Sequence, residues 1–155
     1  MGASEPLPVA ECDRAWQALR LAHDRIAQRL GTELVRECGL VGSEFDALLY
    51  LRTHAAKAVR IGGLQAAVSL SQPTLSRLVA RLEARGLLVR RGAERDHRAV
   101  ILALTEAGST LIDRAIAIRA RVVHEAIADK LSEEEQAALL RALARLGAEG
   151  SRRAI

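Results

Sequence analysis

Apolar residues recur at steps of three and four along most of the chain. That is the spacing of one face of an α-helix. The pattern predicts a mainly helical protein with six helices. They are expected at residues 9–37, from Ser43 onward, and at residues 63–68, 72–85, 105–130 and 132–147.

Serine and glycine residues mark the expected ends of these helices. A serine followed three residues later by an acidic residue has the spacing of a capping box, so we expect helices to begin at Ser43, with Asp46, and at Ser132, with Glu135. Glycine adopts the left-handed conformation that ends many helices. On this basis helices are expected to end at Gly39, Gly86 and Gly147.

One part of the chain departs from the helical period. Residues 87–91 and 99–104 are short and rich in branched apolar side chains, and residues 92–98 between them form a polar connector of hairpin length. Such a pattern predicts a two-stranded β-hairpin. Residues 53–60 show no clear pattern.

The helices at residues 63–68 and 72–85 are joined by the short turn Ser69-Leu70-Ser71, which predicts a helix-turn-helix. Pro73 suits the first turn of the second helix, where a missing N–H costs nothing. That helix is amphipathic: four apolar residues share one face, and the other face is polar and basic. The apolar face holds Leu75, Leu78, Val79 and Leu82.

Composition and charge strengthen this interpretation. Alanine and leucine supply 53 of 155 residues and aromatic residues only 2%, which favours helices packed on helices. The formal net charge is +4, and residues 71–98 contain seven arginines against three acidic residues, so the rest of the chain is neutral. A basic excess confined to one segment is typical of a surface that meets a polyanion.

The second helix of a helix-turn-helix lies in the major groove, where Gln and Arg bond base edges and small hydroxyl side chains bond phosphates. Arginines in the hairpin suit the narrow, negative minor groove, and Asp96 is placed to hold Arg98 by a charge-assisted bond. We therefore predict DNA contacts from Ser71, Gln72, Pro73, Thr74, Ser76, Arg77, Arg81, Arg95, Asp96, His97 and Arg98.

These motifs resemble the winged helix-turn-helix of the MarR (multiple antibiotic resistance regulator) family. The likeness includes an Asp-x-Arg wing signature at Asp96 and Arg98 and a Leu-Thr-x-x-Gly motif at residues 104–108, and residues 40–51 resemble the family's second helix. The resemblance implies a single domain over residues 1–155. In it, a DNA-binding lobe (residues 43–104) with a two-stranded wing lies between dimerisation helices at residues 9–37 and 105–147.

A homodimer that binds a pseudo-palindromic operator, usually as a repressor, is also implied by the resemblance. The apolar faces of the terminal helices favour a dimer independently, because a lobe of this size cannot cover them, although packing within one chain is the alternative. The family often responds to a small aromatic or acidic effector bound between the dimerisation helices and the lobe. Candidate effector-binding residues are Trp16, Arg20, His23 and Asp46.

Other kinds of function remain as alternatives. Cys12 and Cys38 allow a redox-sensing regulator of the same fold, although neither has the surroundings of a reactive thiol. The four histidines form no catalytic or metal-ligating motif, so we expect no cofactor and no metal, and a small helical enzyme or a protein-interaction module is disfavoured. The longest apolar run is far too short to span a membrane, and two cysteines suit a reducing compartment, which predicts a cytoplasmic protein.

Overall fold

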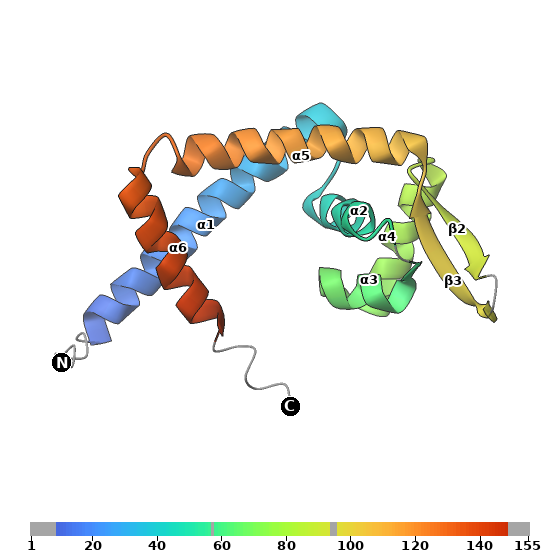
Figure 1. Ribbon diagram of the computed structural model, residues 1–155, viewed down its shortest axis with the longest axis horizontal. Coiled ribbons are helices and arrows are strands. Elements are labelled where there is room, and N and C mark those ends of the chain that lie inside the picture. The colour runs from blue at the N-terminus through green and yellow to red at the C-terminus, as the bar shows by residue number, and fades with distance from the viewer. Residues whose placement is uncertain (1–8, 57, 94–95, 149–155) are drawn as a thin grey trace. The chain divides into compact units, whose positions relative to one another are not determined.

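A computed structural model describes residues 9–56, 58–93 and 96–148 of the chain (Figure 1). The chain is mainly helical, as predicted, and forms two compact units that divide between Arg119 and Ala120, within one long helix. In chain order the elements are α1 (Val9–Cys38), α2 (Gly42–Thr53), β1 (Val59–Arg60), α3 (Ile61–Val68), α4 (Gln72–Ala84), β2 (Leu88–Ala93), β3 (Asp96–Leu104), α5 (Glu106–Ile127) and α6 (Glu133–Ala148).

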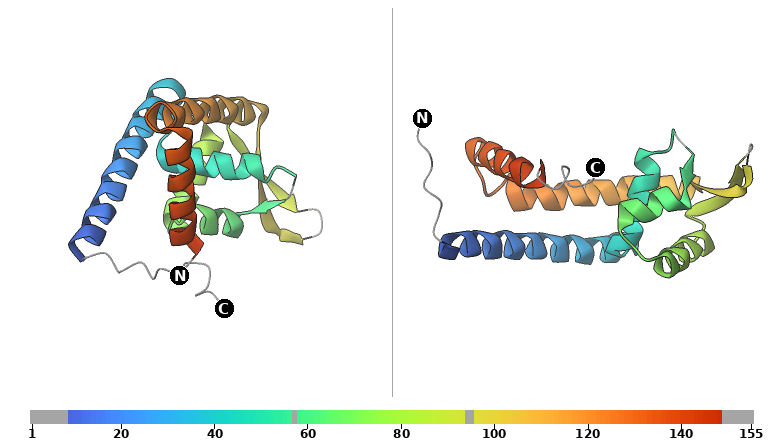
Figure 2. Two further views of the ribbon diagram at one scale, coloured as in Figure 1. Left: turned by 60° about the vertical axis from the view of Figure 1, so that its left-hand side comes forward. Right: turned by 90° about the horizontal axis from the view of Figure 1, so that it is seen from below.

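Helix α1 is one uninterrupted helix of 30 residues (Figure 2). Only Leu34 and Cys38, near its C-terminal end, are buried. The helix ends where the left-handed Gly39 (φ +60°) turns the chain, and the N–H of Leu40 donates to the Leu34 carbonyl at 3.3 Å. The predicted end at Gly39 is confirmed.

The start of α2 differs from the prediction. The helix begins at Gly42 with Val41 as its N-cap, and the Glu44 carboxylate accepts a hydrogen bond from the Val41 N–H at 3.2 Å. Ser43 already lies inside the helix, so the predicted capping box of Ser43 and Asp46 is wrong. The Glu44 side chain supplies one half of the box, and valine has no acceptor to supply the other.

Helix α2 packs against both α3 and α4 to form the core of the lobe (Figure 1). Leu48, Leu64 and Leu78 are fully buried there. Between α3 and α4 the chain turns at Ser69, which has a left-handed φ of 51° that non-glycine residues adopt infrequently. The predicted helix-turn-helix is present, with α3 starting two residues earlier than expected.

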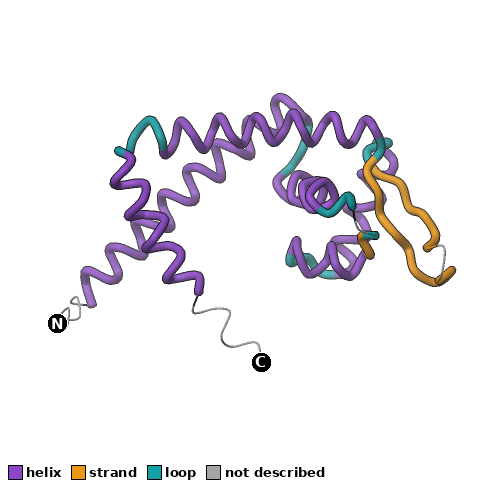
Figure 3. The backbone as a smooth tube through the Cα atoms, in the orientation of Figure 1, coloured by secondary structure: helices purple, strands orange, loops and turns teal. Residues whose placement is uncertain are grey.

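The wing is a three-stranded antiparallel sheet in the order β1-β3-β2 (Figure 3). Its third strand was not predicted: β1 has two residues, with Val59 opposite Leu102 and Arg60 opposite Ile101. A segment of two residues carries no period, so only the partner strand reveals it. Strands β2 and β3 also continue further into the expected connector, with an irregular register at Gly92 and Ala93.

The Leu-Thr-x-x-Gly motif joins the wing to α5. Thr105 accepts a hydrogen bond from the Gly108 N–H through Oγ1 at 3.0 Å, and the same hydroxyl donates to the Gly86 carbonyl at 2.6 Å. A Cβ on Gly108 would lie 1.9 Å from the Leu87 carbonyl oxygen, so only glycine fits. The motif therefore holds the start of α5 against the start of the wing.

The second unit contains the end of α5 and all of α6. Here the predicted capping box is confirmed, because the Ser132 N–H donates to the Glu135 carboxylate at 2.8 Å and the Glu135 N–H donates to Ser132 Oγ at 3.3 Å. The helix continues through Gly147 to Ala148, so the predicted end at Gly147 is wrong. Within the described ranges, no helix is both long and apolar enough to cross a membrane.

Candidate nucleic-acid interface

Helix α4 carries a polar face above a buried apolar face, as its sequence predicts. Leu75, Leu78, Val79 and Leu82 are all buried in the lobe. This packing fixes the rotation of the helix, so the opposite face lies in solvent. The exposed residues include all seven predicted DNA contacts on and before this helix: Ser71, Gln72, Pro73, Thr74, Ser76, Arg77 and Arg81.

The N-terminus of α4 is open and polar. Ser71 is the N-cap residue, and its hydroxyl lies 2.8 Å from the hydroxyl of Thr74. Pro73 occupies the first turn, as predicted. The first turn of a helix has N–H groups without helical partners, which together with two hydroxyls can bind a phosphate.

Arg77 lies one turn further along the same exposed face. Its Nε donates a hydrogen bond to the Pro73 carbonyl at 3.3 Å, which holds the side chain along the helix toward its N-terminus. A guanidinium has five N–H donors, so this bond leaves the terminal nitrogens available for a base edge or a phosphate. Arg77 is therefore positioned beside the polar N-terminus of α4.

Arg81 has a partner that the sequence did not indicate. Its Nε lies 3.5 Å from Oε1 of Glu44, while Nη1 of Arg85 donates to Oε2 of the same carboxylate at 3.1 Å. The Glu44 side chain is only 7% exposed. These residues are about 40 positions apart in the chain, so no local pattern reveals the cluster.

The wing is described only in part. At its base Arg90 Nε lies 3.4 Å from Oε2 of Glu83 on α4, while Arg91 is exposed. The predicted contact Arg95 lies outside the described residues. The structure describes the backbone of β3 but not the side chains of Asp96, His97 and Arg98, so these wing contacts remain predictions.

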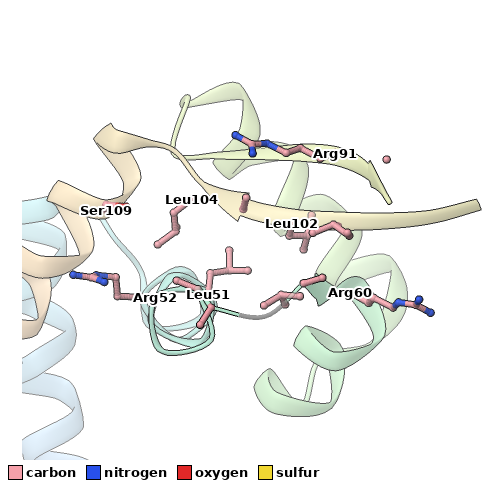
Figure 4. Close-up of a pocket in the computed structure, with 14 residues that line it drawn as sticks. Leu51, Arg52, Arg60, Arg91, Leu102, Leu104 and Ser109 are labelled. Carbon is pink, nitrogen blue, oxygen red and sulfur yellow. The ribbon is translucent and has the colours of Figure 1, made fainter. Parts of the chain in front are cut away.

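A cavity of about 760 Å³ lies beside the wing sheet, between the end of α2 and the start of α5 (Figure 4). Leu51, Leu102 and Leu104 line it, together with three arginines on its edge. The guanidinium groups of Arg52 and Arg60 point away from the leucines and from each other. In a preformed anion site the polar groups point toward one common position. The guanidinium groups of the labelled arginines point in different directions, so this cavity lacks that feature.

The four candidate effector-binding residues lie on two different elements. Trp16, Arg20 and His23 follow one another along an exposed part of α1, and the Trp16 side chain is 61% exposed. Trp16 lies about 33 Å along the helix axis from Cys38, where α1 ends. Asp46 lies on a different element, α2.

Asp46 has an environment of its own. Partial burial raises the pKa of its carboxyl group, and the positive charge of Arg119 partly offsets this rise. It lines a hollow of about 280 Å³ with Leu49, Tyr50 and Thr53. A carboxyl group with a raised pKa beside a hollow is a feature of ligand sites, although structural carboxylates share it.

The two cysteines differ in their surroundings. Cys12 is exposed and Cys38 is buried. Burial raises the pKa of the Cys38 thiol, and the charge of Arg114 only partly opposes this effect. The two residues are about 39 Å apart along α1, so a disulfide between them within one chain is impossible.

Comparison with known proteins agrees with this geometry. A sequence model of the MarR family matches residues 38–99, which include α2, the helix-turn-helix and most of the wing. An uncharacterised HTH-type transcriptional regulator of Bacillus cereus is 30% identical over 110 residues, covering 71% of each chain. The chain belongs to the MarR family. It is a DNA-binding transcription regulator, and its relatives are regulators rather than enzymes, which confirms the predicted class.

Two further relatives extend the MarR assignment. Sco3205, a MarR family transcriptional regulator from Streptomyces coelicolor solved in complex with DNA, has a TM-score of 0.79 and 27% identity. The match covers 96% of this chain and 92% of Sco3205, so the likeness includes the terminal helices as well as the lobe. The organic hydroperoxide resistance transcriptional regulator of Bacillus subtilis is 33% identical over 85 residues, which cover 55% of this chain and 56% of that protein.

Proposed function

We propose that this MarR family regulator is a homodimeric repressor that reads a pseudo-palindromic operator with α4 and the wing. The observation that supports this most is the exposed face of α4, where every predicted contact from Ser71 to Arg81 lies in solvent above a buried leucine face. Phosphate contacts at the N-terminus of α4 would position the lobe, and Gln72 and Arg77 would read bases.

Dimer formation is supported by the exposed leucines of α6. Leu139, Leu140, Leu143 and Leu146 recur at steps that place them along one side of the helix, and Leu140 is 71% exposed. On α1, Trp16 and other large apolar side chains are also exposed. Exposed apolar side chains in such number favour a protein partner, and a second copy would pair two equivalent surfaces.

Selection from randomised duplex DNA tests the operator and its symmetry together. We expect the selected sequences to contain an inverted repeat with half-sites about 10 base pairs apart, one for each α4 of the dimer. Affinity for the repeat should fall steeply with salt, because several arginines displace counterions from phosphates. Recovery of a single unrepeated half-site, or of no sequence at all, would contradict the proposal.

Sedimentation of a matched pair of α6 variants tests the dimer. Leu140→Glu places a charge on the apolar side of α6 and should give a monomer that loses operator affinity. Arg141→Glu introduces the same side chain at the next position, away from the four leucines, and should leave the dimer intact. A dimeric Leu140→Glu variant would exclude this surface as the interface.

Repression itself is tested by transcription from a promoter that contains the selected operator. We expect transcription to rise when the gene for this protein is deleted and to fall again when it is restored. Because the protein would act on DNA in the cell, this proposal also gives it a cytoplasmic location. A fall on deletion would identify an activator.

Release by a small aromatic acid is the proposed form of control. Arg20 supplies a carboxylate partner, Trp16 a stacking surface and His23 a hydrogen-bond group, while Asp46 would have to act with them across the dimer or at a separate hollow. An effector shifts the equilibrium only by its differential affinity for the two forms. Arg20→Ala should therefore reduce release by an aromatic acid found by calorimetric screening, without changing operator affinity in its absence.

Redox control is the second candidate, supported by the likeness to the organic hydroperoxide resistance regulator. The raised pKa of the buried Cys38 thiol disfavours its reactive thiolate form, so the exposed Cys12 is the better candidate. Release from DNA by peroxide, lost in a Cys12→Ser variant, would favour this mechanism over small-molecule control. Release retained in the double serine variant would exclude it.

A further inference from the structure

Glu44 is a buried acidic residue beside the DNA-binding helix. It lies at the third position of α2, and it is the buried charged side chain among the residues whose burial the structure describes. Burial of a carboxylate is costly unless its oxygens have hydrogen-bond donors or positive partners. The surroundings of Glu44 therefore have to supply them.

Three groups surround the Glu44 carboxylate. Its Oε2 accepts hydrogen bonds from the Val41 N–H at 3.2 Å and from Arg85 Nη1 at 3.1 Å, and its Oε1 lies 3.5 Å from Arg81 Nε. The first contact caps α2, whereas the other two reach across to α4. One carboxylate thus joins the start of α2 to the second half of the DNA-binding helix.

Arg81 and Arg85 hold different positions at this carboxylate. Arg85 is the C-cap residue of α4, and its side chain, which is 37% exposed, pairs with the carboxylate at the end of the helix. Arg81 lies on the same exposed face as Arg77, one turn away, and its side chain is 59% exposed although its Nε faces Glu44. The Nε edge of the Arg81 guanidinium thus faces the carboxylate, while more than half of the side chain remains accessible to solvent.

We propose that Glu44 is a positioning residue that sets the DNA specificity of this regulator through Arg81. The carboxylate fixes the planar guanidinium in one orientation, in which it suits one site on DNA. The negative charge of the carboxylate also offsets the positive charge of Arg81, which would otherwise attract any phosphate. Without Glu44, Arg81 would be a mobile cation that binds the backbone of every sequence alike.

The test is Glu44→Gln, which keeps an acceptor for the Val41 N–H but removes the charge. Binding to the selected operator and to random duplex is measured over a range of salt. We expect random DNA to bind about tenfold more tightly at low salt, and the slope of log K against log salt to steepen by about 0.9 for each phosphate gained. The operator gains less, so the ratio of the two affinities falls.

Two controls separate this role from a general effect of charge or packing. Glu106→Gln removes the same charge from an exposed site at the start of α5 and should leave the slope unchanged. In an Arg81→Ala background, Glu44→Gln should have no further effect on random DNA. An equal effect of Glu106→Gln, or an effect that persists without Arg81, would overturn the inference. Equal weakening on both DNAs with an unchanged slope would also overturn it, since it indicates a structural role alone.

Arg81→Lys tests the same idea without touching the buried carboxylate, in case Glu44→Gln does not fold. Lysine keeps the charge but has no planar fork that can bond Glu44 and DNA together. The ratio of operator to random affinity should fall while the salt slope stays constant, and an unchanged ratio would refute the proposal. The inference rests on DNA reading by α4: if the unmodified protein selects no operator, the proposed function itself fails.

Discussion

Most leucine side chains of the lobe are buried, whereas those of α6 are exposed. In the lobe, Leu48, Leu64 and Leu78 have no more than 1% of their surface exposed, and the helices around them share one core. In α6, Leu140 and Leu146 are 71% and 65% exposed. The lobe therefore completes its core within one chain, whereas α6 presents the kind of surface that a protein partner covers.

In the proposed homodimer, the lobe and α6 would have two separate tasks. A DNA-reading surface has to be rigid, because bidentate contacts depend on where the backbone holds each side chain. A surface that joins two subunits has to remain open in the single chain. The lobe meets the first need through buried leucines, the Glu44 carboxylate and the Thr105 hydroxyl, and the exposed leucines of α6 suit the second.

Of the substitutions proposed, we expect Gly108→Ala to disrupt the packing of the lobe the most. The new Cβ would meet the Leu87 carbonyl oxygen at 1.9 Å, so the start of α5 has to move away from the wing. We expect a loss of about 3 kcal/mol or more in the free energy of unfolding, measured with denaturant. Gly147→Ala in α6 is the matched control, because within the described residues a Cβ there would meet no atom closer than 4 Å apart from its neighbours in the same helix. It should change stability by less than about 1 kcal/mol. Equal losses of stability in the two variants would show that Gly108 is no more tightly packed than Gly147.

Truncation after Lys130 tests whether the lobe is independent of α6. We expect the truncated chain to be monomeric by sedimentation and to lose operator binding, because two linked half-site contacts become one. Its lobe should still unfold cooperatively, since α6 supplies none of the buried leucines there. A truncated dimer that keeps operator affinity would place the interface elsewhere.

Arg77→Ala tests whether an exposed side chain of the DNA-binding helix reads a base. If Arg77 bonds a base, the substitution should cost about 1–3 kcal/mol on the operator and relax specificity at one position in each half-site. Stability should hardly change, because the side chain is exposed and its hydrogen bond goes to the Pro73 carbonyl of its own helix. Selection with the variant protein measures this, and equal losses on operator and random DNA would limit Arg77 to phosphate contact.

Substitutions in the wing should have a graded effect. Arg98→Ala is expected to weaken DNA binding with the fold intact, by loss of a minor-groove contact. Asp96→Ala should weaken it less, because it would remove only the group that positions Arg98. Titration of labelled operator with each variant measures the order. An unaltered affinity in Arg98→Ala would exclude this side chain from DNA binding.

The smallest expected effect concerns the ion pair between α2 and α5. The Arg52 guanidinium bonds both oxygens of Asp113, at 2.8 and 3.2 Å, and this hydrogen bonding lowers the pKa of the Asp113 carboxyl group. A carboxyl group with a lower pKa in the folded state stabilises the fold above its unfolded pKa of about 3.8 and loses that contribution as the pH falls. Both side chains are exposed, so the contribution is small.

Thermal unfolding at a series of acidic pH values measures the contribution of this pair. Asp113→Asn should make the melting temperature slightly less dependent on pH below about 4 than in the unmodified protein. Arg52→Gln should have the same effect, and the double variant should add nothing to either. Additive effects would show that the two residues act separately.

Local patterns in the sequence were enough to predict most of the helices and the face of α4 that lies in solvent. Helical spacing is a local property, and four buried apolar residues on α4 allow only one rotation of that helix. The turn at Ser69, the hairpin and the end of α1 at Gly39 follow from neighbouring residues in the same way. The basic segment at residues 71–98 could also be identified from the sequence, because charged residues can be counted without coordinates.

Contacts between residues far apart in the chain became known only from the three-dimensional structure. Strand β1 has two residues and exists because β3 lies beside it. Glu44 is one acidic residue among many until α4 brings Arg85 to it across 41 positions of the chain. The observed start of α2 differs from the predicted one for a related reason. The Glu44 carboxylate, which pairs with two arginines of α4, also accepts the hydrogen bond that caps the helix, so Glu44 and not Ser43 defines the first turn. Such pairings depend on the path of the chain in space, and local spacing does not encode that path.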